Sequence, residues 1–138
     1  MSTRIQVTCA IIFYEGKILC AQRGQNMSHA LKWEFPGGKI ETGESQQECI
    51  KREIKEELNL EIEPIQLLQS NFHQYQPDKE IELIPFVCRY IKGKLILKEH
   101  KKIVWLRPCD LSKLDWAQAD IPIVAQVQVI ESFNNLPS

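Results

Sequence analysis

Residues 38–60, GKIETGESQQECIKREIKEELNL, contain the features that decide the fold and point to a chemical site. Ser45 and Glu48 form an S-x-x-E capping box, in which each side chain satisfies a backbone N–H of the first helical turn. The predicted helix runs to about residue 58, and Asn59 suits a left-handed C-terminal stop. Apolar residues recur at helical spacing and form the stripe that must be buried: Ile50, Ile54 and Leu58.

Three carboxylates project together from the neighbouring face of this helix. Glu53, Glu56 and Glu57 form a cluster, because residues three and four apart are neighbours on a helix. Glu53 and Glu57 are a like-charge i,i+4 pair, which destabilises an isolated helix by about 0.2–0.5 kcal/mol. A solvated charged face is the structural alternative. Hard cations such as Mg²⁺ or Mn²⁺ favour oxygen clusters of this kind, so the cluster predicts a metal site.

The same stretch resembles the Nudix box, G-x5-E-x7-R-E-U-x-E-E-x-G-U, where U is a bulky aliphatic residue. Gly38, Glu44 and the run 52–60 occupy its fixed positions. The one departure is Asn59, where the family has Gly, and Asn tolerates the left-handed conformation better than other non-Gly residues. The resemblance implies an α+β fold, the Nudix α/β/α sandwich with a central mixed sheet between helices, and a phosphoanhydride hydrolase.

Size and composition suggest one domain over residues 1–138. The chain is 43% hydrophobic and 25% charged, with a net charge of −1. No overall field attracts it to a polynucleotide or a membrane surface, and no apolar run approaches the roughly 18 residues of a membrane span. The N-terminus lacks the pattern of a signal peptide. The expected partner is a small-molecule nucleotide, and the chain is a monomer or a homodimer.

The cysteine pattern favours a reducing cytoplasm. Five cysteines stand at wide spacings without a C-x2-C pair, so neither a zinc site nor a disulfide framework is indicated. Most are expected to be small core residues, and Cys49, close to the carboxylates, is expected to be partly accessible. The five are Cys9, Cys20, Cys49, Cys88 and Cys109.

Hydrophobic patterning along the chain predicts the order βββ–α–βββ–α. Residues 14–17 form a tight hairpin turn, and residues 23–29 are a polar, turn-rich loop at a cleft edge. The last helix is predicted over 121–133, with Asp120 as its N-cap and Pro122 tolerated in its first turn. Strands are expected at 5–13, 17–22, 61–75, 81–90, 94–98 and 104–106.

The resemblance to Nudix enzymes also implies catalytic roles. The Gly37 carbonyl joins the three clustered glutamates as a candidate metal ligand, and Arg52 is expected to hold Glu53 or the adjacent loop by a bidentate pair. Glu44 either supports the site or is a residue favoured near the positive helix end.

The general base has two candidates. Glu53 is the first, and Glu99 is the second. Glu99 resembles the additional metal-binding or base glutamate of MutT-like enzymes, although a surface charge on a loop is the alternative. His100 is expected to face solvent or to position a neighbour, because no partner for its second ring nitrogen is evident.

Two cations and three further residues are candidates for substrate binding. Arg23 and Lys39 agree with MutT-like positions that contact the triphosphate, and the alternative for each is a surface cation. The residue at the position of Asp120 touches the base in this group. A protonated Asp donates to a carbonyl and an ionised Asp accepts from an amine, unless it is only a helix cap. Phe35 and Phe72 either stack on the base or belong to the core.

Two segments point to the substrate class. WEFPGGKIE resembles MutT-type nucleoside triphosphate pyrophosphohydrolases, and AQADIPIV resembles bacterial CTP pyrophosphohydrolases. The leading hypothesis is a Mg²⁺-dependent enzyme that converts (d)NTP to (d)NMP and pyrophosphate. It would serve nucleotide-pool sanitation and DNA repair, with 8-oxo-dGTP or CTP-like substrates. The alternatives are a Nudix module that binds nucleotide without turnover, an ADP-sugar pyrophosphatase, and a structural protein whose charged helix pairs with a partner.

Overall fold

Strand β1 (Thr3–Tyr14) lies inside a mixed sheet. The computed structural model describes residues 3–130, and within that range one sheet of eight strands has the main path β3-β2-β1-β7-β5. β1 and β7 run parallel and the other pairings are antiparallel. β4 pairs with β1, β6 with β7 and β8 with β2. The remaining strands are β2 (Lys17–Gln22), β3 (Trp33–Glu34), β4 (Gly37–Lys39), β5 (Glu61–Leu67), β6 (Asn71–Gln76), β7 (Lys79–Lys92) and β8 (Lys102–Leu106).

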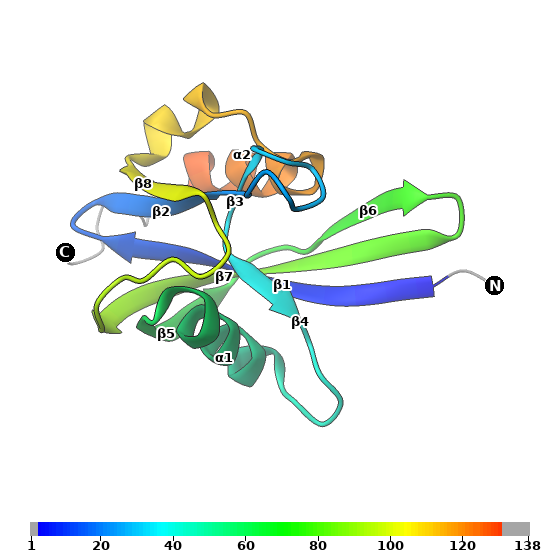
Figure 1. Cartoon of the computed structure of the whole chain (residues 1–138), viewed down its shortest axis with the longest axis horizontal. Coiled ribbons are helices and arrows are strands. Elements are labelled where there is room, and N and C mark those ends of the chain that lie inside the picture. The colour runs from blue at the N-terminus through cyan, green and yellow to red at the C-terminus, as the bar shows by residue number, and fades with distance from the viewer. Residues whose placement is uncertain (1–2, 131–138) are drawn as a thin grey trace.

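Apolar residues on both faces of the sheet build two cores. Side chains alternate along a strand, so Ile11 of β1 enters one core and Ile12 enters the other. Helix α1 (Gln46–Leu58) covers the second core with its predicted stripe, which is fully buried. Helix α2 (Ile121–Val129) and the short helices η1 (Pro108–Lys113) and η2 (Gln118–Asp120) cover the first. Figure 1 shows α1 and α2 on opposite sides of the sheet, which confirms the predicted α/β/α sandwich.

The predicted hairpin turn between the first two strands is confirmed. β1 ends at Tyr14 and β2 begins at Lys17, and the two residues between them have positive φ, 51° at Glu15 and 77° at Gly16. Two consecutive positive φ values are the requirement of a type I′ turn, whose twist matches that of the flanking strands.

The strand predicted at residues 94–98 is wrong. β7 ends at Lys92, and Gly93 turns the chain with a φ of 116°. The following segment lies along the end of α1 instead of joining the sheet. Its Ile96 N–H donates to the Leu58 carbonyl at 3.0 Å, so the terminal carbonyls of the helix are satisfied by this loop.

The single strand predicted at 61–75 is also wrong, because it is divided into β5 and β6. Between them, Leu68 is buried, with its N–H bonded to the Pro85 carbonyl at 2.9 Å, and the side chain of Gln126 bonds both backbone groups of Gln69. These tertiary contacts bend the chain at a point where the sequence reads as continuous strand.

The prediction for the last helix is only partly correct. α2 ends at Val129, and residues 131–133 of the predicted span lie outside the described range. Asp120 makes no side-chain capping bond and already has helical φ and ψ. A short helix, η2, leads directly into α2, so the Asp120 carboxylate is available for another partner.

Two expectations for the cysteines are corrected. Cys49 is fully buried, with its Sγ 3.2 Å from the Thr8 Oγ1, and Cys109 is the exposed one. The side of α1 that carries Cys49 is covered by β1 and β4, which the sequence alone did not show. Within residues 3–130, no helix is long and apolar enough to cross a membrane.

Candidate active site

Helix α1 presents the carboxylates because both of its ends are fixed. The capping box is formed, with the Glu48 N–H donating to Ser45 Oγ at 3.1 Å and the Ser45 N–H donating to Glu48 Oε1 at 2.9 Å. At the other end Asn59 adopts the left-handed conformation with a φ of 59°. The expected caps at both ends are confirmed.

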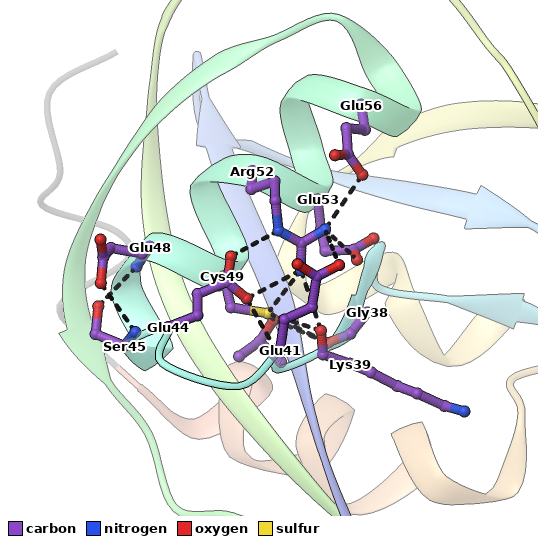
Figure 2. A network of polar contacts seen from close by, with 11 residues as sticks. Gly38, Lys39, Glu41, Glu44, Ser45, Glu48, Cys49, Arg52, Glu53 and Glu56 are labelled. Carbon is purple, nitrogen blue, oxygen red and sulfur yellow. Dashed lines mark hydrogen bonds and ion pairs between the residues drawn. The ribbon is translucent and has the colours of Figure 1, made fainter.

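Arg52 joins α1 to the loop that precedes it. Its Nε and Nη2 donate to the two oxygens of Glu44 at 2.6 and 3.0 Å, and its Nη1 donates to Glu53 Oε1 at 2.9 Å. Figure 2 shows the guanidinium at the centre of this network. The bidentate partner is therefore Glu44 in the loop, and Glu53 receives a single bond. Glu44 accepts hydrogen bonds from the Arg52 side chain and from the Glu41 N–H, and these bonds lower the pKa of Glu44 to about 2.

Glycines bring β4 and the helix close together. A Cβ on Gly37 would collide with the Thr8 carbonyl oxygen of β1, and a Cβ on Gly38 would collide with the Glu53 carboxyl group. The absence of side chains therefore allows the Glu53 carboxylate to lie directly on the β4 backbone. The Gly37 residue, whose carbonyl is a candidate ligand, belongs to the same short strand.

Glu57 is partly buried, and one oxygen of its carboxyl group lacks a hydrogen-bond partner. Its Oε2 is buried and has no hydrogen-bond partner. Burial raises the pKa of Glu57 strongly, and the negative charges of Glu53, Glu34 and Glu99 raise it further. A buried oxygen with unsatisfied lone pairs, surrounded by other carboxylates, fits a divalent cation.

The other predicted ligands are arranged differently. Glu56 has a side chain that is 60% exposed and accepts a bond from Arg52 Nη1 at 3.2 Å, as Figure 2 shows. Glu99 is exposed and within electrostatic range of Glu57. In this conformation, no three His, Cys, Asp or Glu side chains in the described range 3–130 are grouped closely enough to hold an ion. The structure thus brings Glu53 and Glu57 together and directs Glu56 towards Arg52.

The predicted substrate residues occupy separate positions. Arg23 Nε donates to the Ser28 carbonyl at 2.6 Å and its Nη1 donates to Glu34 Oε1 at 2.8 Å, so the polar loop after β2 is held by its own arginine. Lys39 is exposed at the end of β4. Phe72 is half exposed on β6, with the Arg4 guanidinium 4.9 Å from its ring centroid.

Asp120 and Phe35 meet in the core. The Phe35 N–H donates to Asp120 Oδ2 at 3.0 Å, and the Phe35 ring packs at 4.7 Å from that of Trp116 with 2% of the residue exposed. The Phe35 ring therefore has little open face. Burial raises the pKa of Asp120 to about 8, and the charge of Glu34 contributes, against the opposing effects of the Phe35 N–H and Arg23.

Sequence reasoning gave no role to Glu34, and of the two alternatives for His100 the structure excludes the solvent-facing one. His100 is buried instead of facing solvent, and its Nε2 lies 2.8 Å from Glu34 Oε2. The signal for Glu34 was a charged residue between two aromatic residues of a buried strand, Trp33 and Phe35. The signal for His100 was absent, because its partner lies 66 residues away in the sequence.

Comparisons with known proteins agree with the fold and the motif. A family model described as the NUDIX domain matches residues 3–127. The CTP pyrophosphohydrolase of Escherichia coli (strain K12) is 38% identical over 87% of this chain and 88% of that protein. The 8-oxo-dGTP diphosphatase of the same strain is 29% identical over 91% of this chain and 97% of that protein.

Solved structures show the same architecture. The solution structure of the E. coli ORF135 protein has a TM-score of 0.78 at 35% identity and covers 90% of this chain and 88% of that one. The solution structure of the MutT protein from methicillin-resistant Staphylococcus aureus 252, described as a Nudix hydrolase, has a TM-score of 0.75 at 41% identity. It covers 93% of this chain and 98% of that one. With the box, the sandwich and these matches in agreement, the chain belongs to the Nudix family of hydrolases.

Proposed function

We propose that this chain is a Mg²⁺-dependent nucleoside triphosphate pyrophosphohydrolase, which converts (d)NTP and water to (d)NMP and pyrophosphate. The observation that carries the proposal is the Glu57 carboxyl group, whose Oε2 is buried without a hydrogen-bond partner and which is close to the charge of Glu53. Burial and the charge of Glu53 both oppose ionisation of Glu57. A hard divalent cation relieves both effects, which supports a metal-dependent reaction at this face of α1.

The candidate ligands for Mg²⁺ or Mn²⁺ are the carboxylates of α1, with contributions from the preceding strand and a distant loop. A bound cation would supply positive charge at the phosphoryl oxygens. Arg52 holds Glu53 and Glu44 in place, so the helix and the loop before it present a fixed set of oxygens. The proposed ligands are Gly37 (carbonyl), Glu53, Glu56, Glu57 and Glu99.

Glu53 is the first candidate for the general base. Its carboxyl group lies against the backbone of Gly38, and the bond from Arg52 Nη1 to its Oε1 at 2.9 Å holds it in place. In the proposed reaction a water oxygen bonds to phosphorus, its proton passes to the base, and the P–O bond to the leaving pyrophosphate breaks. Glu99 is the second candidate, because its loop is bonded to the end of α1.

The substrate class rests on the relatives and on the polar groups near β3. CTP pyrophosphohydrolase and 8-oxo-dGTP diphosphatase are the activities named for two relatives, and both substrates are nucleoside triphosphates. We assign Arg23 and Lys39 to the triphosphate. Asp120 is assigned to the base, and its raised pKa keeps the carboxyl protonated at neutral pH, so that it donates to a carbonyl of the base. Phe35 and Phe72 stay candidates for contacts with the base.

A nucleotide panel tests the proposal. Pyrophosphate and phosphate release should be measured with Mg²⁺ for 8-oxo-dGTP, dGTP, CTP, dCTP, 5-methyl-dCTP and ADP-ribose. We expect pyrophosphate, with no free phosphate, from at least one triphosphate, and no release in excess EDTA. Turnover of ADP-ribose alone would favour an ADP-sugar pyrophosphatase. Binding of a triphosphate without release from any compound would favour a nucleotide-binding module.

Substitution of Glu53 by Gln tests the assignment of the base. Glu53→Gln keeps the size of the side chain and removes its ability to take a proton, so kcat should fall by about 10²–10⁴-fold. Affinity for the nucleotide, measured by calorimetry, should change little. Glu63→Gln is the matched control, because Glu63 forms an exposed ion pair with Arg89 on the β5–β7 edge. A Glu53→Gln enzyme with unchanged kcat would transfer the role of base to Glu99.

A further inference from the structure

The carboxylate of Glu34 joins two loops that are far apart in the sequence. Its Oε1 accepts a bond from Arg23 Nη1 at 2.8 Å, and its Oε2 lies 2.8 Å from His100 Nε2. Arg23 begins the loop after β2, whereas His100 lies in the loop between β7 and β8. The His100 side chain is 2% exposed and that of Glu34 is 18% exposed. Solvent therefore screens this contact weakly.

The surroundings of the two ring nitrogens of His100 favour a proton on Nε2. The Glu34 carboxyl group accepts a bond from Arg23, and its second oxygen offers an acceptor to Nε2 of His100, which favours Nε2 as the donor. Nδ1 is buried without a partner. With the proton on Nε2, the buried Nδ1 carries only a lone pair. With the proton on Nδ1, the ring would lose its hydrogen bond to Glu34. A single charge-assisted hydrogen bond thus sets the orientation of the ring.

The backbone on both sides of His100 is tied to the fold. The Lys98 N–H donates to the Glu57 carbonyl at 3.3 Å, and the Lys101 N–H donates to the Gln22 carbonyl at 2.9 Å. One end of this short segment is therefore fixed on α1 and the other on β2. The His100 side chain adds a buried contact with β3 between these two ends.

Glu99 lies between these anchors. Its carbonyl oxygen is packed against Gly24, where an added Cβ would approach to 3.1 Å. Its side chain is exposed, and its negative charge is among the causes that raise the pKa of Glu57. The backbone of Glu99 is thus confined next to the end of α1 that carries Glu57.

We infer that His100 is a positioning residue for Glu99: through the bond between its Nε2 and Glu34, it holds the segment 98–101 against β3 and keeps Glu99 next to the end of α1, where the Lys98 N–H bonds the Glu57 carbonyl. This inference rests on the proposed function, in which Glu99 serves as a metal ligand or base. His100 itself touches neither substrate nor cation. Through the shared carboxylate of Glu34, the Arg23 loop is fixed to the same point.

Two substitutions of His100 separate the hydrogen bond from the volume of the ring. His100→Leu fills the site without a donor, whereas His100→Gln places an amide N–H close to the position of Nε2. His73→Leu is the matched control, a partly buried histidine on β6. For each variant, the thermal midpoint, Mn²⁺ affinity without nucleotide, kcat and KM should be measured.

The first readout is independent of activity. Hydrogen exchange at the amides of Lys98 and Lys101 should be about tenfold faster in His100→Leu, while exchange in β1 is unchanged, because only the local segment is released. His100→Gln should restore the protection. Unchanged protection in His100→Leu would overturn the inference, whether or not the protein hydrolyses nucleotides.

The second readout is a double-mutant cycle between His100 and Glu99. His100→Leu should lower kcat and Mn²⁺ affinity by about 10–100-fold, in the range seen when the support of a ligand is lost. In a Glu99→Gln background the same change should have little further effect, because the group that it positions is already missing. Additive losses, or full kcat in Glu99→Gln alone, would contradict the inference. Pyrophosphate release by the wild-type protein reports separately on the proposed function.

Discussion

Asp120 shows how a single buried carboxyl group couples stability to pH. The residue is 5% exposed, and burial raises the pKa of its carboxyl from 3.8 to about 8. The folded protein therefore binds this proton more tightly than the unfolded chain does. The stabilising contribution is fully present below about pH 4, and it is lost as the pH rises towards 8.

Asp120→Asn tests this coupling. Asn has the same shape as Asp, keeps an oxygen for the Phe35 N–H and does not ionise. The stability of the variant protein relative to wild type should therefore increase with pH. We expect the free energy of unfolding in urea, variant minus wild type, to rise by about 2–4 kcal/mol between pH 5 and pH 8. A parallel pH dependence of the two proteins would show that the Asp120 carboxyl is not protonated in the native state.

Helix α1 is the element that brings the carboxylates of the candidate site together. Lys51 and Lys55 are a like-charge i,i+4 pair, as are Glu53 and Glu57, and each pair destabilises an isolated helix. Arg52 compensates by bonding carboxylates in the loop and on the helix, and the caps fix both ends. Among the described residues, no hydrogen bond joins Arg52 to the Glu57 carboxyl group. This carboxyl group is therefore available to a cation.

Ser45→Ala tests the contribution of the N-terminal cap. The substitution removes the oxygen that accepts the Glu48 N–H, and the free energy of unfolding should fall by about 1 kcal/mol. Ser112→Ala on the exposed side of η1 is the control and should change stability by less than about 0.5 kcal/mol. A loss in Ser45→Ala no greater than in the control would mean that the box adds nothing to the stability of the fold.

Metal binding should be visible in the stability of the whole molecule. A cation that binds only the folded chain stabilises it by about 2.7 kcal/mol at a concentration of 100 Kd, which raises Tm by several degrees. The Tm in Mg²⁺ should therefore exceed that in EDTA for the wild type and for Glu63→Gln. Glu57→Gln should lose this shift, because the buried ligand is gone. A shift retained in full by Glu57→Gln would place the cation elsewhere.

Local sequence patterns predicted much of the architecture. The capping box, the apolar stripe of α1 and the Glu15–Gly16 turn are set by neighbours in the sequence, and the structure contains all three. The segment 94–98 shows the limit of such patterns. Its run of apolar residues suits a strand, but the N–H groups of Ile96 and Lys98 bond to carbonyls at the end of α1 instead.

At the site, the sequence by itself determined that the carboxylates of α1 and Arg52 lie together, because residues three and four apart are neighbours on a helix. The motif that contains them also indicated the family. Only the tertiary structure decided that Glu57 is buried with an unpaired oxygen, that Glu34 joins Arg23 to His100, and that Asp120 bonds the Phe35 backbone. These contacts join segments distant in the sequence, and burial, which sets their pKa values, arises only when the layers pack.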